Sequence, residues 1–195
     1  MRNVGFRVEL TAPGRASLSG RSVSNITALS DAMARPESSV LTLRDLAQAR
    51  LHAELTFVTK DDLQGVDCSI ENVLAATDFV IPALEILSMQ NGATTAGMYV
   101  VGGCACDPRD TDLRTLGIVV DKNGEIAGMG AGAAVLGHPA QAVIELVRHL
   151  AARGQELPAG SLVMSGGITD AIPVMAGDVV AARFQGLGSV SIRLA

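Results

Sequence analysis

The segment spanning residues 51–58 constrains the fold more than any other part of the chain. Its odd-numbered positions are apolar and its even-numbered positions up to residue 56 are polar, which is the pattern of a β-strand with one buried face. Side chains at i and i+2 share a face of a strand, so we expect His52 and Glu54 to point the same way, with Cα atoms about 6.5–7 Å apart. The pattern therefore predicts an imidazole and a carboxylate side by side.

Glu85 is the best candidate for a third group beside them. It lies inside the apolar run 79–87, where a buried carboxylate is costly unless it is paired or bound to a metal ion. His52, Glu54 and Glu85 together predict a site for a divalent cation. The alternative interpretation is an ordinary solvated sheet face that carries a histidine and a glutamate, and the spacing alone does not decide between the two.

The composition indicates one domain, residues 1–195, with a substantial core. Hydrophobic residues make up 48% of the chain and charged residues 18%, so much of the chain must be interior or subunit interface, and we expect a homo-oligomer. With 21 glycines and few aromatic residues, a turn-rich sheet protein is favoured over a disordered chain. The net charge of −5 offers no basic surface for nucleic acid.

The chain carries no signal for secretion or for membrane insertion. Its three cysteines are too few and too unevenly spaced for a disulfide framework, which favours a reducing compartment. The N-terminus has no apolar stretch of signal-peptide length, and no apolar run approaches the length of a membrane span. We expect a soluble, cytoplasmic protein with no membrane partner.

Local signals predict many strands and few helices. Residues 1–45 are expected to be an irregular part of the pocket, with a short strand at 5–10 and a loop over 11–30. Helices are expected at 69–76 and from His138 to Arg153, and Asn123-Gly124 between two apolar runs predicts a β-hairpin. Further strands are expected at 96–101, 162–165, 179–184 and 189–194.

Three short motifs do not carry the chemistry they suggest. The glycine-rich segment 128–134 follows a hairpin instead of a first strand, so a dinucleotide-binding loop is rejected. Cys104 and Cys106 lack a second pair to close a tetrahedral metal site. The segment 165–167 lacks the strand–turn–helix context and the triad partners of a serine hydrolase.

Four segments in the second half of the chain carry a family resemblance: 136–143, 157–166, 173–178 and 186–190. Together they resemble the 2-hydroxypenta-2,4-dienoate hydratase and 4-oxalocrotonate decarboxylase family, whose members act in aromatic catabolism. The resemblance implies the α+β fold of the fumarylacetoacetate hydrolase superfamily, a mixed β-sheet roll with few helices. It also implies a divalent cation held by a Glu-x-Glu strand and a later glutamate, at positions that fall on His52, Glu54 and Glu85.

The resemblance also shows where this chain departs from the family. A histidine at position 52 widens the metal choice from Mg²⁺ or Mn²⁺ to Zn²⁺ or Fe²⁺, and loss of the metal is the alternative. Arg7 replaces a family lysine and cannot shuttle a proton near neutral pH. Gly167 stands where the family usually has serine. The implied catalytic residues are Arg7, Glu54 and Glu85, and the implied substrate-binding residues are Arg7, Asn25, Thr94 and Thr169.

The implied function is that of a lyase acting on a small 2-oxo or 2-hydroxy dienoic acid through a metal-stabilised dienolate. Arg7 stands at a family lysine and Asn25 at a family acidic residue, so the acid–base pair that hydration needs is depleted. Decarboxylation, tautomerisation or ring formation needs this pair less and is favoured. Two alternatives remain open. One is altered or metal-free chemistry on the same scaffold, as in a tautomerase or cyclase of a biosynthetic pathway. The other is a catalytically silent subunit that associates with a paralogous enzyme.

Overall fold

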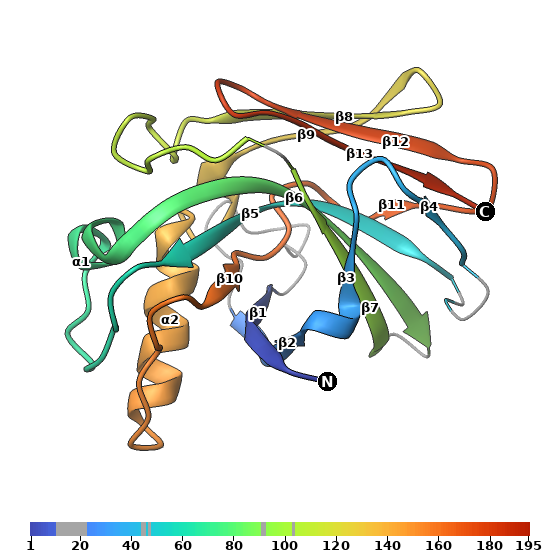
Figure 1. Ribbon diagram of the computed structural model, residues 1–195. Coiled ribbons are helices and arrows are strands. Elements are labelled where there is room, and N and C mark those ends of the chain that lie inside the picture. The colour runs from blue at the N-terminus through green and yellow to red at the C-terminus, as the bar shows by residue number, and fades with distance from the viewer. Residues whose placement is uncertain (11–22, 44–45, 47, 91–92, 103) are drawn as a thin grey trace, which may run out of the picture.

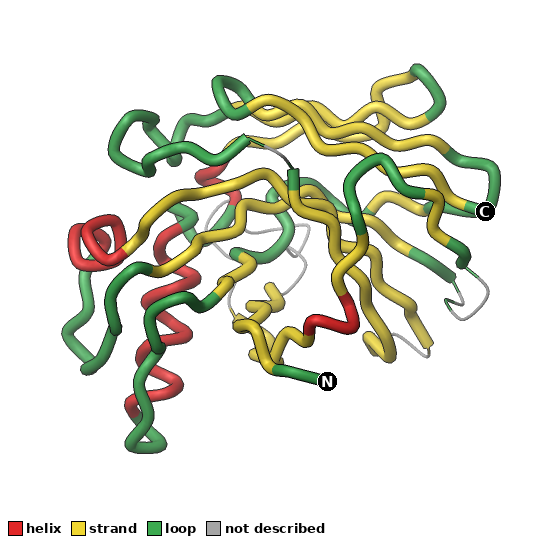
Figure 2. The backbone as a smooth tube through the Cα atoms, viewed as in Figure 1, coloured by secondary structure: helices red, strands yellow, loops and turns green. Residues whose placement is uncertain are grey.

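Two β-sheets packed against each other form the body of the protein in the computed structural model, which describes residues 1–10, 23–43, 46, 48–90, 93–102 and 104–195 (Figure 1). Within these residues, eight strands form the first sheet and five form the second. The expected mixed β-sheet roll with few helices is confirmed, and Figure 2 shows how small the helical share of the chain is.

The first sheet has the order β2-β1-β10-β5-β6-β7-β3, with β11 paired to β5. Its strands are β1 (Asn3–Leu10), β2 (Val23–Ser30), β3 (Ala34–Arg35), β5 (Arg50–Thr59), β6 (Thr77–Gln90), β7 (Ala93–Val101), β10 (Leu162–Met164) and β11 (Ile172–Pro173). The pairing is mostly antiparallel, but β1 runs parallel to β10 and β3 runs parallel to β7.

The second sheet has the order β4-β13-β12-β8-β9. Its strands are β4 (Val40–Leu41), β8 (Gly117–Lys122), β9 (Glu125–Ala131), β12 (Val179–Phe184) and β13 (Gly188–Leu194). The α-helices are α1 (Ile70–Ala76) and α2 (Ala140–Ala151), and the short 3₁₀ turns are η1 (Asp31–Met33) and η2 (Gly132–Ala134). Within the described part of the chain, no helix is both long and apolar enough to cross a lipid bilayer.

The first sheet curls until its two edges come close together. Strands β2 and β3 are its opposite edges, yet only the three residues of η1 connect them. A three-residue link spans roughly 10 Å even when fully extended, far less than the width of a flat sheet of this size. The sheet therefore forms a roll, and one of its faces becomes an interior.

The two faces of the curled sheet have different partners. The outer face of β5 carries Leu51, Leu55 and Phe57, which are fully buried in a large core shared with the second sheet and with α2. The inner face carries the polar residues of β5 and a small separate apolar cluster that includes Tyr99 and Met164. The alternation seen in the sequence thus separates a packing face from a polar interior.

Several local predictions are confirmed. Asn123 and Gly124 have φ values of 56° and 86°, as a two-residue type I′ turn requires, and they join β8 to β9. Ser69 caps α1 by accepting from the backbone N–H of Asn72. The apolar stripe of α2 is buried, and the glycine-rich segment 128–134 belongs to β9 and η2 instead of a phosphate-binding loop.

The prediction of a loop over residues 11–30 is wrong for the part of it that the structure describes. Residues 23–30, expected to be loop, form strand β2, which pairs antiparallel with β1 from Asn3 to Leu10. The segment is rich in serine, threonine and asparagine, and as an edge strand it needs few apolar side chains. Residues 11–22 of the expected loop lie outside the described residues.

Candidate active site

Strands β5 and β6 bring the three predicted metal-binding residues onto one face. His52 lies directly opposite Glu85 in the antiparallel register, and Glu54 lies opposite Ala83. Since Ala83 and Glu85 are two residues apart, all of these side chains start from the inner face of the roll. The sequence prediction that His52 and Glu54 share a face is therefore met by the strand pairing.

Glu54 and Glu85 form a buried pair of carboxyl groups. Their exposed fractions are 1% and 3%, and a hydrogen bond joins the two side chains. A hydrogen bond between two carboxyl groups requires that one of them keeps its proton. The backbone N–H of Gly166 donates to Glu54 Oε2 at 3.0 Å, so the loop after β10 fixes the orientation of this side chain.

Arg7 reaches the carboxyl pair from the opposite side of the roll. Its Nη1 donates to Glu85 Oε1 at 3.0 Å, its Nη2 pairs with Glu9, and its Nε donates to Thr27 Oγ1 at 3.1 Å. In a flat sheet three strand spacings, about 14 Å, would separate β1 from β6. The contact exists because the sheet curls, and Arg7, Glu9, Glu54 and Glu85 are called the roll cluster below.

Burial sets the protonation of the roll cluster. It raises the pKa of Glu54 well above its ordinary value, and the neighbouring Glu85 raises the pKa of Glu54 further. Burial also raises the pKa of Glu85, although Arg7 and the hydrogen bond from Glu54 oppose that rise. Arg7 bonds to Glu85, so its positive charge offsets the effect of burial on the pKa more strongly at Glu85 than at Glu54.

His52 is oriented by the loop that follows β10. Its Nδ1 lies 3.4 Å from the backbone carbonyl oxygen of Thr169, which can only accept, so Nδ1–H is the donor of this hydrogen bond. A Cβ atom on Gly167 would lie 2.5 Å from Nδ1 of His52, closer than real Cβ contacts come. The glycine at 167 thus makes room for the imidazole at 52.

The two carboxyl groups and the imidazole of His52 are ligand types that suit a divalent cation, although they do not converge on one point. Two adjacent buried carboxyl groups that must share a proton form an environment in which a cation can replace that proton, and a neighbouring imidazole is a common third ligand. Among the residues that the structure describes, no three His, Cys, Asp or Glu side chains converge closely enough to hold a metal ion. The divalent-cation site at His52, Glu54 and Glu85 stays a prediction.

The predicted substrate-binding residues have different surroundings. Thr169 is buried at 1% exposure, and its hydroxyl accepts a hydrogen bond from the backbone N–H of Ala53 at 3.2 Å. Asn25 is exposed on β2 opposite Glu9, and its side chain accepts from the backbone N–H of Ile26. The side chain of Thr94 lies outside the described part of the chain. Of the predicted substrate-binding residues, Arg7 therefore contacts Glu85, and Thr169 contacts His52.

Sequence reasoning missed three members of the site. Glu9 follows Arg7 at i+2, so strand parity could have placed both on the inner face. Thr27 lies in a segment expected to be loop, and no local signal pointed to it. The backbone N–H of Gly166 is not visible in any side-chain pattern.

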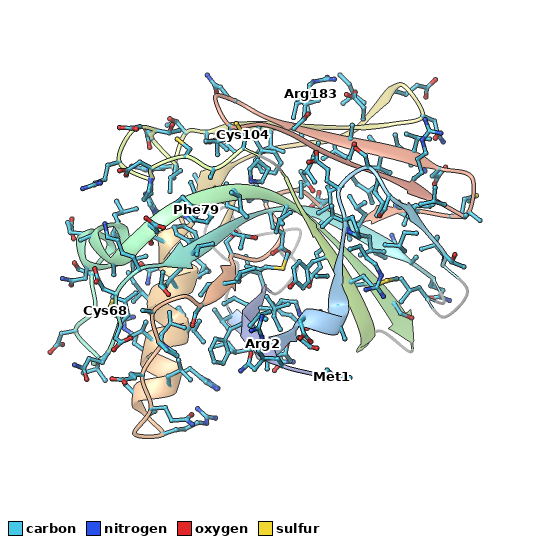
Figure 3. The ribbon with its side chains drawn as sticks, viewed as in Figure 1. Met1, Arg2, Cys68, Phe79, Cys104 and Arg183 are labelled. Carbon is cyan, nitrogen blue, oxygen red and sulfur yellow. The ribbon has the colours of Figure 1, made fainter. Side chains whose placement is uncertain are left out.

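The cysteines take no part in the site. Cys68 is buried before α1, whereas Cys104 is exposed beyond β7, and Figure 3 shows the two well separated. Cys106 donates weakly to the backbone carbonyl of Asp107.

Comparison with known proteins gives matches along almost the whole chain. Residues 24–195 match the family model described as fumarylacetoacetate (FAA) hydrolase C-terminal. The 4-oxalocrotonate decarboxylase of Pseudomonas sp. (strain CF600) is 42% identical over 97% of this chain and 76% of the relative. The 2-hydroxyhexa-2,4-dienoate hydratase of Comamonas testosteroni is 35% identical over 85% of this chain and 68% of the relative.

A solved structure gives the same result in three dimensions. The 4-oxalocrotonate decarboxylase from Pseudomonas putida G7, complexed with magnesium and adipate, superposes with a TM-score of 0.89 and 38% identity. The match covers 100% of this chain and 78% of that chain. The similarity therefore includes the strands that carry Glu54 and Glu85.

Proposed function

Because the chain belongs to the fumarylacetoacetate hydrolase C-terminal family, we propose that it is a lyase that removes CO₂ from a small conjugated 2-oxo acid such as 4-oxalocrotonate. The resemblance to the hydratase and decarboxylase enzymes is confirmed, and the relatives are lyases of both kinds. Identity is higher to the decarboxylase, at 42%, than to the hydratase, at 35%, which favours the first reaction.

The observation that carries the proposal is the position of Arg7 inside the roll cluster. Addition of water to a double bond needs a side chain that gives or takes a proton beside a positioned water molecule. Arg7 keeps its proton near neutral pH, and its pairing with Glu85 and Glu9 raises its pKa further although burial opposes this. The cluster therefore offers fixed positive charge instead of a proton shuttle.

Fixed positive charge is what decarboxylation requires. The bond between the carbon chain and the departing carboxylate breaks, its electron pair enters the conjugated enolate, CO₂ leaves, and a proton from solvent completes the product. Arg7 can bind a carboxylate of the substrate bidentately and so orient the breaking bond. The buried surroundings strengthen this interaction, because Arg7 and both carboxyl groups of the pair are buried.

A divalent cation is the cofactor that we propose for this reaction. Glu54, Glu85 and His52 are the residues that would hold it, and when bound it would stabilise the negative charge on the 2-oxo oxygen of the substrate. Support comes from the paired carboxyl groups of this chain and from the magnesium in the related decarboxylase structure. Mg²⁺ and Mn²⁺ suit the carboxylates, and His52 also admits Zn²⁺ or Fe²⁺.

The proposal is tested with protein purified without chelator. We expect absorbance of 4-oxalocrotonate to fall in the presence of Mg²⁺ or Mn²⁺ with release of one CO₂ per molecule, and 2-hydroxypenta-2,4-dienoate to remain unhydrated. Glu145→Gln on the exposed face of α2 serves as the control variant and should react like the unmodified protein. Turnover of the dienoate without turnover of 4-oxalocrotonate would overturn the proposal.

The expected homo-oligomer and the paralogous partner subunit stay predictions. Ile126 and Met129 on the edge strand β9 are 63% and 69% exposed, which gives the second sheet an apolar rim for a self-association contact. Light scattering of the purified protein measures the oligomer directly. A monomer at micromolar concentration, with no co-purifying relative, would remove both expectations.

A further inference from the structure

Thr56 is a buried polar residue on the inner face of the roll that the proposed reaction does not yet use. It follows Glu54 at i+2 on β5, so both side chains start from the same face. In the strand register it lies opposite Met164 on one side and Ile81 on the other. Met164 is in turn opposite Arg7, so Arg7 and Thr56 stand in one row across the sheet.

The hydroxyl group of Thr56 has no hydrogen-bond partner among the described residues, and the residue is 0% exposed. A buried hydroxyl without a partner destabilises the folded protein, because it loses its bonds to water and gains none in return. Valine has nearly the same shape and an equal preference for strands, and β5 already contains Val58. A threonine at this position therefore requires a reason other than folding.

The neighbouring polar side chains show that the missing hydrogen bond is specific to Thr56. Arg7 bonds to three partners, Glu54 receives the N–H of Gly166, and Thr169 bonds to the backbone of Ala53. Among these four described residues, Thr56 is the one whose polar side-chain atom has no hydrogen-bond partner. A hydroxyl on the same face of the sheet as a carboxyl pair and an arginine can donate to an oxygen atom of an anion bound on that face.

We propose that Thr56 is a substrate-binding residue, whose hydroxyl donates a hydrogen bond to a carboxylate or 2-oxo oxygen of the acid that occupies the roll. This inference rests on the proposed function, since it assumes that a small oxo acid binds beside Glu54 and Arg7. It adds a specificity element that the family resemblance did not supply. The bond forms only when ligand is present, which explains why the folded protein keeps an unpaired hydroxyl there.

The test separates ligand binding from stability. Binding of 2-oxoadipate in the presence of Mg²⁺ is measured by calorimetry, because this saturated analogue keeps both carboxylates and the oxo group but lacks the double bond that accepts the electrons. Thr56→Val should weaken binding about 5- to 10-fold, the value of one neutral hydrogen bond. Its melting temperature should equal or exceed that of the unmodified protein, because an unpaired hydroxyl has been removed.

Two further variants make the result specific. Thr56→Ser keeps the hydroxyl and should bind 2-oxoadipate within about twofold of the unmodified protein. Ser39→Ala removes the other buried hydroxyl oxygen that has no partner among the described residues, and Ser39 lies between β3 and β4, away from the carboxyl pair. This control should leave the affinity unchanged.

The possible failures are distinguishable. If the unmodified protein does not bind 2-oxoadipate at all, the proposed function fails and this inference fails with it. If the unmodified protein binds and Thr56→Val binds equally well, only the role of Thr56 is overturned. A fall in the melting temperature of Thr56→Val together with its affinity would also overturn it, because the hydroxyl would then serve the fold.

Discussion

Among the residues that the structure describes, buried carboxyl groups lie in two places, and their pKa values shift in opposite directions. In the roll cluster, burial raises the pKa of both Glu54 and Glu85. At the hairpin between β8 and β9, Asp178 is also buried, at 6% exposure, yet its pKa is lowered. Burial alone therefore does not decide the protonation of a carboxyl group in this molecule.

The difference lies in the number of donors that each carboxyl group receives. Burial opposes ionisation of Asp178, but Asn123 Nδ2 donates to it at 2.7 Å and the backbone N–H of Met175 at 3.0 Å, with Lys122 Nζ at 3.7 Å. Glu54, in contrast, receives one backbone N–H and faces another carboxyl group. Asp178, Asn123 and Lys122 are called the turn cluster.

This comparison separates a structural site from the candidate functional one. Each donor at Asp178 favours the charged form, so the turn cluster stabilises the fold and joins the hairpin to the start of β12. The carboxyl pair in the roll costs stability, because two acidic groups are buried with insufficient compensation. An arrangement that costs stability persists where binding or catalysis uses it, and the next variants test whether this contrast is real.

Arg7→Met is expected to have the largest effect on stability. It removes the guanidinium that pairs with Glu85 and Glu9, and loss of one partner of a buried ion pair typically costs about 3–5 kcal/mol of unfolding free energy. Urea unfolding should show this loss at pH 8. The loss should shrink toward pH 5, because Glu85 without Arg7 has a raised pKa and the folded state then takes up protons that the unfolded state does not.

The matched control for this variant is Arg183→Met on β12. Arg183 pairs with Asp121 on the outer side of the second sheet, where Figure 3 shows it far from the roll, and its side chain is 62% exposed. An exposed ion pair contributes about 0–1 kcal/mol. Equal losses for the two variants would show that the roll cluster is no more sensitive than the surface.

Much of the scaffold around these clusters follows from local sequence. The alternation of residues 51–58 defines the two faces of β5, and Asn123-Gly124 defines the hairpin because both residues adopt positive φ. Strand β2 was missed because its serine-, threonine- and asparagine-rich sequence resembles a loop until pairing with β1 supplies the backbone hydrogen bonds.

The candidate site could be predicted only in part, for a physical reason. Parity places Glu54 on the inner face, and burial within an apolar run identifies Glu85. The contact of Arg7 with Glu85 depends on how far the sheet curls, which is a property of the whole sheet and leaves no periodic signal. The fit of His52 against Gly167 likewise depends on a loop more than a hundred residues away.

Glu54→Gln is expected to act on function and stability in opposite directions. Turnover of 4-oxalocrotonate should fall on the order of 10²–10³-fold, the typical effect of removing one group that supports transition-state charge. Stability should rise, because an amide can still donate to Glu85 and accept from Gly166 without a buried charge. The raised pKa of Glu54 means that the unmodified protein loses stability as pH rises above about 4.3, the ordinary value of a glutamate, so the advantage of the variant should grow with pH from there.

This variant is compared with Glu145→Gln, which should change neither property because Glu145 pairs with Arg148 on the surface of α2. Urea midpoints across the pH range and a spectrophotometric assay give the two readings. If Glu54→Gln were less stable than the unmodified protein at every pH, the carboxyl pair would be a structural element like the turn cluster.

Asp178→Asn is expected to give the smallest effect and the opposite pattern. Replacing the carboxylate disrupts its bonds to Asn123 and Met175, which should cost about 1–3 kcal/mol of unfolding free energy at pH 7 while leaving turnover unchanged. The lowered pKa of Asp178 stabilises the unmodified protein above pH ~4, the ordinary value of an aspartate, and this stabilisation is lost as pH falls through the folded-state pKa. The urea midpoints of the two proteins should therefore approach each other as pH falls below about 4.

Asp107→Asn is the control variant, because it removes a negative charge without disturbing a buried hydrogen-bond network such as the turn cluster. Asp107 pairs with Arg109 in an exposed loop, so its replacement should leave the urea midpoint at pH 7 unchanged. A loss for Asp178→Asn that is the same at pH 7 and pH 3 would mean that the side chain acts through its shape instead of its charge. In that case the number of hydrogen-bond donors would no longer explain why the buried carboxyl group of Asp178 stabilises the fold and that of Glu54 destabilises it.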